Sequence, residues 1–306
     1  VNEMSRTTAK IYIGVWSAVL LLFTALFGYL WYNGGWTGLS LHFGWSNHST
    51  YQQVHEQTFT EPIQTLALDW KGGDVSVFST SGKEIKIVQK AVKNTPEDQF
   101  FQASIEDDAL VVSNGKIVAG LPIGPFPFSI GSDLEVYLPE RIYETLQLDT
   151  TGGDIFFQPL EVKDLVVHTN SGDVSLGGDF EKLDFSSNSG DLLCRDVTVK
   201  QLISQTTSGD IQASGSFARI QATSTSGDIS LRTSQMITEA AIQSTSGDVV
   251  LFIPENDGFT AQLNSSTGDF ICAFPDFHGG DTYRYKDGSA KIQLNTTSGD
   301  ACLLYA

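Results

Sequence analysis

Cysteine and positive charge are both scarce in this chain of 306 residues. Its three cysteines, Cys194, Cys272 and Cys302, are irregularly spaced and form neither a disulfide framework nor a zinc-binding motif. Only 18 basic residues stand against 36 acidic ones, which gives a formal net charge of −18. Because a surface of this sign repels phosphate backbones, nucleic acid is not an expected partner.

Charged residues are missing altogether from one long apolar run, residues 11–32. As a helix this run would span about 30 Å, the thickness of a bilayer core. Arg6 and Lys10 precede the run, and the next basic residue is Lys71. The positive-inside rule therefore predicts a cytoplasmic N-terminus at 1–10 and a single-pass transmembrane helix, with the rest of the chain extracellular.

A cleaved signal peptide is the competing interpretation of this run. The run is longer than the apolar part of such peptides, and it ends in bulky aromatic residues rather than a small-residue cleavage site. We therefore predict an uncleaved signal-anchor in the cell membrane. Residues 33–55, which are polar and rich in glycine, are predicted to form a juxtamembrane stalk.

The remaining residues, 56–306, contain a repeated Gly-Asp pair. Its aspartates are spaced by 18 to 21 residues from Asp154 to Asp269, with two further pairs ending at Asp74 and Asp300. Apolar residues stand eight and six positions before each Asp and one and three positions after it, with few exceptions. Such alternation is typical of half-buried strands. Each repeat therefore predicts a strand, a tight turn and a shorter strand.

Repeats of this kind can bury their apolar faces only when successive coils stack on one another. We therefore predict an all-β fold, a single-stranded, β-helix-like β-solenoid of about nine coils, behind the N-terminal transmembrane helix. The period is interrupted between 78 and 145. Alternating stretches in this interval predict inserted strands or hairpins.

The turn residues themselves are predicted to be structural. Glycine is expected to supply a positive φ, and aspartate to accept a nearby backbone N–H as in an Asx-turn. The Ser and Thr residues before the glycines are expected to form hydrogen bonds along the stack. The structural turn positions are Gly172, Asp173, Gly190, Asp191, Gly209, Asp210, Gly227, Asp228, Gly247, Asp248, Gly268, Asp269, Gly299 and Asp300.

Two alternatives assign chemistry to the same aspartates. Stacked carboxylates about 4.8 Å apart could bind calcium, although the nine-residue calcium β-roll motif is absent. A carbohydrate-active solenoid would need acids and bases gathered on one face, but the basic residues of the coils do not recur at one repeat position. The main prediction has no catalytic residue, cofactor or metal. The calcium alternative would use Asp173, Asp191, Asp210, Asp228 and Asp248.

The C-terminal end of the predicted solenoid allows two hypotheses. Residues 301–305 have the pattern of a last repeat strand, and an extra segment around 283–287 lies between the last two Gly-Asp pairs. That segment is expected to fold back as a partial cap, because open coils expose unpaired strand edges. Alternatively, the edge at 301–305 pairs with a second copy or another protein by strand addition.

Three features together resemble the bacterial putative-adhesin family of β-strand-repeat domains over roughly residues 56–306. They are the Ser-Gly-Asp turns from Asp173 to Asp248, the steps Leu138-Pro139 and Ile253-Pro254, and the last Gly-Asp pair. The resemblance implies a surface structural, sensing or binding role, and it supplies no catalytic motif. We therefore expect a non-enzymatic, membrane-anchored cell-envelope protein that acts as a surface scaffold, an adhesin-like binding module or an envelope-stress component. Its expected partners are the membrane and a protein or the cell wall.

Overall fold

The computed structural model of the chain describes residues 51–117, 131–275 and 282–306. The predicted anchor at 11–32 and most of the predicted stalk lie outside these residues. Within them, no helix has the length and apolar character needed to cross a membrane. All of the described strands lie in one compact unit that extends to residue 306.

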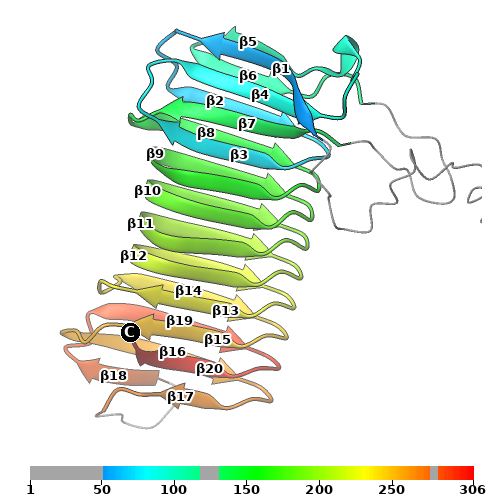
Figure 1. Cartoon of the computed structure of the whole chain (residues 1–306). Coiled ribbons are helices and arrows are strands. Elements are labelled where there is room, and N and C mark those ends of the chain that lie inside the picture. The colour runs from blue at the N-terminus through cyan, green and yellow to red at the C-terminus, as the bar shows by residue number, and fades with distance from the viewer. Residues whose placement is uncertain (1–50, 118–130, 276–281) are drawn as a thin grey trace, which may run out of the picture. The chain divides into compact units, whose positions relative to one another are not determined.

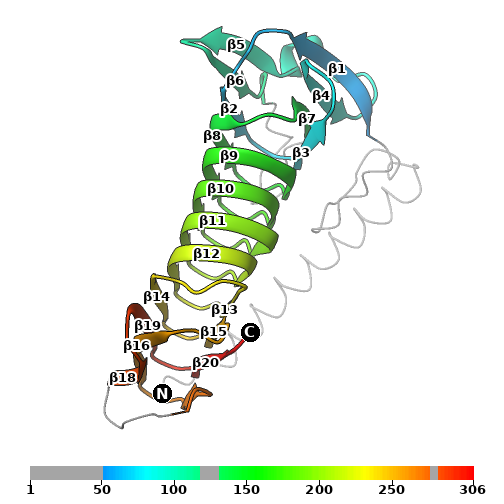
Figure 2. The same cartoon turned by 90° about the vertical axis from the view of Figure 1, so that its left-hand side faces the viewer.

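Stacked two-sided coils form the middle of this unit (Figure 1). Each coil has a long strand on one side, which leads through the Gly-Asp turn to a short strand on the other side. The short strand then bends and continues as the long strand of the next coil. Figure 2 shows these bent strands as consecutive bands. The bent strands are β9 (Ile155–Thr169), β10 (Val174–Ser187), β11 (Leu192–Thr206) and β12 (Ile211–Ser224), and the straight strand β8 (Tyr143–Thr150) pairs with the long side of β9.

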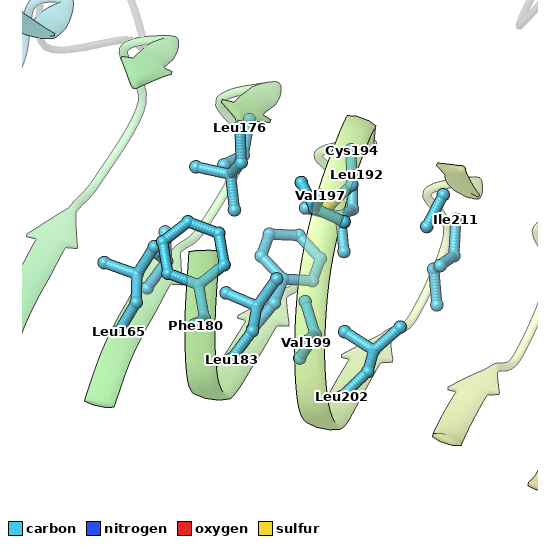
Figure 3. Packing of buried hydrophobic residues seen from close by; sticks show 14 of the residues in the cluster. Leu165, Leu176, Phe180, Leu183, Leu192, Cys194, Val197, Val199, Leu202 and Ile211 are labelled. Carbon is cyan, nitrogen blue, oxygen red and sulfur yellow. The ribbon is translucent and has the colours of Figure 1, made fainter. Parts of the chain in front are cut away.

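Neighbouring coils pair in parallel and in register, so that equivalent residues form columns. Leu165, Leu183 and Leu202 are aligned on the long strands and are completely buried. Figure 3 shows these leucines packed with Phe180 and Val199 between the two sides of the stack. Because alternate side chains of each strand point inward, the alternation in the sequence becomes a continuous core. The all-β prediction is confirmed.

The stretch between 78 and 145 extends the stack and then closes it. β2 and β3 lie on β8 and β9, and β6 and β7 form one more coil on β2 and β3. The antiparallel strands β5, β4 and β1 cover this last coil. The strands are β1 (Gln52–Phe59), β2 (Thr65–Trp70), β3 (Val75–Thr80), β4 (Ile85–Ala91), β5 (Gln102–Glu106), β6 (Ala109–Ser113) and β7 (Asp133–Pro139). β1 thus begins before the predicted solenoid boundary at residue 56.

At the C-terminal end, the order of the coils differs from the order of the sequence. β19 lies between β14 and β16, and β20 lies between β15 and β17 (Figure 1). The antiparallel strand β18 covers the other edge of β16. The strands are β13 (Ile229–Thr233), β14 (Glu239–Ser244), β15 (Val249–Ile253), β16 (Gly258–Ser265), β17 (Phe270–Cys272), β18 (Thr282–Lys286), β19 (Ala290–Thr296) and β20 (Ala301–Tyr305).

This order corrects the expectation of an open edge at 301–305. Both sides of β20 are paired, on one side with β15 and on the other with β17. This order leaves the outer edge of β16 free for β18. The segment around 283–287 does fold back as a partial cap. On the other side of the final coil, β17 is the outermost of the described strands.

Candidate functional site

The aspartates of the turns form one hydrogen-bonded ladder along the stack. The backbone N–H of each Asp donates to Oδ1 of the Asp in the adjacent coil, over nine bonds of 2.7 to 3.1 Å. The Asp210 N–H, for example, donates to Asp191 at 2.7 Å. We call this column the aspartate ladder. In spatial order it contains Asp133, Asp74, Asp154, Asp173, Asp191, Asp210, Asp228, Asp248, Asp300 and Asp269.

The ladder differs from the expected Asx-turn, in which each carboxylate would accept an N–H of its own turn. Within each turn it is a hydroxyl that accepts a backbone N–H: the Gly209 N–H donates to Thr206 Oγ1 at 3.0 Å and the Gly227 N–H to Ser224 Oγ at 2.8 Å. The carboxylate oxygen of each aspartate accepts an N–H of the next coil instead. The aspartates connect coils rather than shape single turns.

The turn glycines also have a different role from the one expected. None of the glycines that directly precede an aspartate of the aspartate ladder has a positive φ. Instead, the coils approach each other so closely that a Cβ atom on Gly209 would lie 2.1 Å from the carbonyl oxygen of Gly190. On Gly153 it would lie 1.7 Å from the oxygen of Gly73. Glycine is required because no side chain fits between adjacent turns.

A column of hydroxyl side chains four positions before the aspartates completes the turns. Ser244 Oγ accepts the N–H of Gly247 at 3.0 Å and donates to the carbonyl oxygen of Gly227 in the adjacent coil at 3.0 Å. The serines directly before the glycines bond along the stack through their backbone. Sequence reasoning missed this hydroxyl column, whose members are Thr150, Thr169, Ser187, Thr206, Ser224, Ser244, Ser265 and Thr296. The bonding stops toward the N-terminal coils, because the buried Oγ1 of Thr150 has no hydrogen-bond partner and Trp70 takes this position before Asp74.

The geometry gives no support to a metal centre at the ladder. Across 51–117, 131–275 and 282–306, no group of three or more His, Cys, Asp or Glu residues is placed to hold a metal ion. The five aspartates of the calcium alternative are connected by backbone N–H groups bonded to their Oδ1 atoms. On the long strands, carboxylates pair with lysines of the adjacent coil, as Glu144 does with Lys163 at 2.6 Å.

A groove runs beside the aspartate ladder on the outer surface of the short strands. It is a hollow of about 370 Å³ that follows five coils, from the coil of Asp74 to the coil of Asp210. Phe156, whose side chain is 46% exposed, is its largest apolar group. We call it the ladder groove. Its lining includes Asp74, Ser76, Asp154, Phe156, Asp173, Ser175, Asp191, Leu193, Asp210 and Gln212.

Aromatic side chains extend the apolar surface beyond the end of the ladder groove. The ring of Phe156 lies 6.1 Å from the ring of Phe78, which stacks on Tyr137 at 5.2 Å. Burial, together with the hydrogen bond to Glu135, raises the pKa of the Tyr137 hydroxyl above its ordinary value. Sequence reasoning missed this aromatic cluster, because Phe78 and Tyr137 fall in the interrupted stretch and meet only when β7 pairs with β3.

Similarity to known proteins is found at the level of one family and of several solved structures. No protein of curated function matches the chain. Among solved structures, it is similar to a putative lipid binding protein from Parabacteroides distasonis (14% identity, 81% of this chain and 96% of that one, TM-score 0.49). It is also similar to putative adhesins from Bacteroides fragilis (14%, 65% and 96%, TM-score 0.42) and Parabacteroides merdae (13%, 82% and 95%, TM-score 0.35). The model of one protein family, described as toastrack DUF4097, matches residues 63–303. The chain therefore belongs to the toastrack DUF4097 family.

Proposed function

We propose that the chain is a non-enzymatic cell-envelope protein, in which a single-pass anchor displays the coil stack outside the cell as an adhesin-like binding module. The observation that supports this most is the aspartate ladder. Its carboxylates are bonded into the fold, while the ladder groove beside them leaves a large surface open for a protein or cell-wall partner.

The uniformity of the ladder argues against acid–base chemistry. Catalysis by paired carboxylates depends on two groups in different environments, one protonated and one ionised. Asp173, Asp191 and Asp228 instead share one arrangement, each exposed and each accepting the N–H of the next aspartate. No contact among the described residues favours the carbohydrate-active or the calcium-binding alternative over a binding module.

The topology is tested by adding protease to intact protoplasts that express the full chain with a C-terminal epitope tag. If the stack lies outside, the tag is lost without lysis, while a cytoplasmic marker protein is preserved. If the tag survives until the membrane is broken, the proposed display at the cell surface is wrong.

Binding is tested by photo-cross-linking on intact cells. A benzoylphenylalanine in place of Phe156 should form a discrete adduct with an envelope component, because this side chain lies in the groove. The same replacement of Gln243, an exposed residue of β14 far along the stack, is the control. A lack of adducts from position 156, or equal adducts from both positions, would contradict binding through the groove.

A further inference from the structure

We propose that the ladder groove binds an extended peptide segment in which positively charged side chains alternate with apolar ones. This inference rests on the proposed function as a binding module and specifies its ligand class. It follows from three properties of the groove: its surface shape, its charge and its length.

The surface shape of the groove comes from one row of outward-facing side chains that are aligned from coil to coil. Across five successive coils the row reads Ser76, Phe156, Ser175, Leu193 and Gln212. Small serines therefore alternate with the bulky Phe156 and Leu193. Because these two lie two coils, or about 10 Å, apart, Ser175 lies in an apolar recess that can hold one aliphatic or aromatic side chain.

The charge of the groove selects a cationic ligand. Five carboxylates, from Asp74 to Asp210, follow one side of the hollow, and no Lys or Arg contributes to its lining. Carboxylates at such close spacing repel one another, and a ligand with positive charges relieves this repulsion. A bare cation would leave the recess around Ser175 unfilled, and a neutral sugar would leave the carboxylates uncompensated.

The length of the groove fits a short extended segment. Five aspartates one coil apart span about 19 Å, and an extended chain covers this distance with about six residues. Alternate residues of such a segment point to opposite sides. Three of them can therefore face the carboxylates, while the other three face the row that contains Phe156 and Leu193.

The binding test uses asparagine because it keeps the Oδ1 acceptor of the ladder while an NH2 group replaces Oδ2 and the negative charge is lost. The double variant Asp173→Asn/Asp191→Asn changes the groove, while Asp248→Asn/Asp300→Asn makes the same charge change in ladder positions outside it. The probe is the blocked hexapeptide Lys-Leu-Lys-Leu-Lys-Leu, compared with a version in which glutamine replaces lysine. Kd is measured by calorimetry on the full chain in non-ionic detergent.

The proposal predicts that the groove variant binds the lysine peptide about three- to tenfold more weakly than the control variant, since two exposed charge contacts are lost. Phe156→Ser should weaken binding, whereas Ile271→Ser, at an equally exposed residue of β17, should not. The glutamine peptide should bind poorly, and added salt should weaken the binding of the lysine peptide.

Three results would overturn the inference: no binding of the lysine peptide, an equal loss of affinity in both aspartate variants, or equal affinity for both peptides. An equal loss of affinity in both variants would indicate diffuse attraction to an acidic surface. Equal binding of both peptides would indicate a ligand without positive charge. If the peptide fails to bind but position 156 still cross-links to an envelope component, the ligand class is wrong and the proposed binding function stands.

Discussion

At the scale of single residues, each turn combines one hydrogen bond within itself with close contacts to the adjacent coil. The glycine allows the coils to approach, the hydroxyl four positions before the Asp bonds the glycine, and the aspartate accepts an N–H of the neighbouring coil. The Gly-Asp repeat could be read from the sequence, but the direction of these contacts could not. A pattern within one repeat does not show which groups face the next coil.

The close approach of the turns predicts a large cost for Gly209→Ala. The added Cβ would overlap the carbonyl oxygen of Gly190, and backbone cannot yield as a flexible side chain does. We expect the free energy of unfolding in urea to fall by about 3 kcal/mol. The matched control is Gly152→Ala. A Cβ atom added there would meet no atom outside the neighbouring residues within 4 Å, so the free energy of unfolding should change by less than about 0.5 kcal/mol. Similar losses at both positions would contradict this explanation.

The ladder predicts that alanine and asparagine differ at position 210. In Asp210→Ala the N–H of Asp228, which donates to Asp210 at 2.8 Å, loses its acceptor, so we expect a loss of about 1 kcal/mol. Asp210→Asn keeps that acceptor and should remain within about 0.5 kcal/mol of the parent chain. Urea denaturation of the two variants measures the difference. An asparagine variant as unstable as the alanine variant would show that the negative charge, not the hydrogen bond, matters.

Burial raises the pKa of the Cys194 thiol to about 12. In the unfolded chain the thiol ionises near pH 9, so the unfolded state releases a proton that the folded state keeps. The contribution of the buried thiol to stability is therefore complete below pH 9 and is lost as the pH rises toward 12. Between pH 8 and 10, the unfolding free energy of the parent chain should fall more steeply than that of Cys194→Val. Parallel pH profiles would contradict the assigned burial.

At the scale of whole elements, the alternation of apolar residues predicted strands and columns, but not which coils are neighbours. Leu251, Leu303 and Cys272 occupy equivalent inward positions, so each could lie next to either of the others. The order is decided by the antiparallel pairing of β18 with β16, a contact between distant segments. At the other end, the coil that contains β7 was not predicted, because Ser132 separates Gly131 from Asp133 and no Gly-Asp pair marks its turn.

The order of the coils can be tested by comparing two truncations in adjacent strands. Leu303 in β20 is completely buried between two coils, so Leu303→Ala should cost about 2–5 kcal/mol in urea. Cys272 occupies the equivalent inward position of β17 but is only partly buried at the end of the stack, so Cys272→Ala should cost less than about 1 kcal/mol. If Leu303→Ala were as mild as Cys272→Ala, β20 would have to be an edge strand.

At the scale of the whole described unit, the sequence allowed the fold class to be predicted because the repeat is regular over the central coils. The ladder groove was not predictable. The groove forms because Phe156 and Leu193 lie on either side of Ser175 in neighbouring coils. This alignment follows from the register between coils, which the sequence does not show. The role of the aspartates is the point on which the structural and the metal-binding accounts diverge most.

The measurement that tests this point most directly is the melting temperature of the full chain in EDTA and in excess calcium. If the carboxylates serve to bond one coil to the next, the two melting temperatures should agree within about 2 °C, which corresponds to less than about 1 kcal/mol for a unit of this size. A ligand that binds only the folded state raises its melting temperature. A rise of about 10 °C or more in calcium, abolished by Asp191→Asn/Asp210→Asn, would show that the ladder is a cation site and would contradict the account.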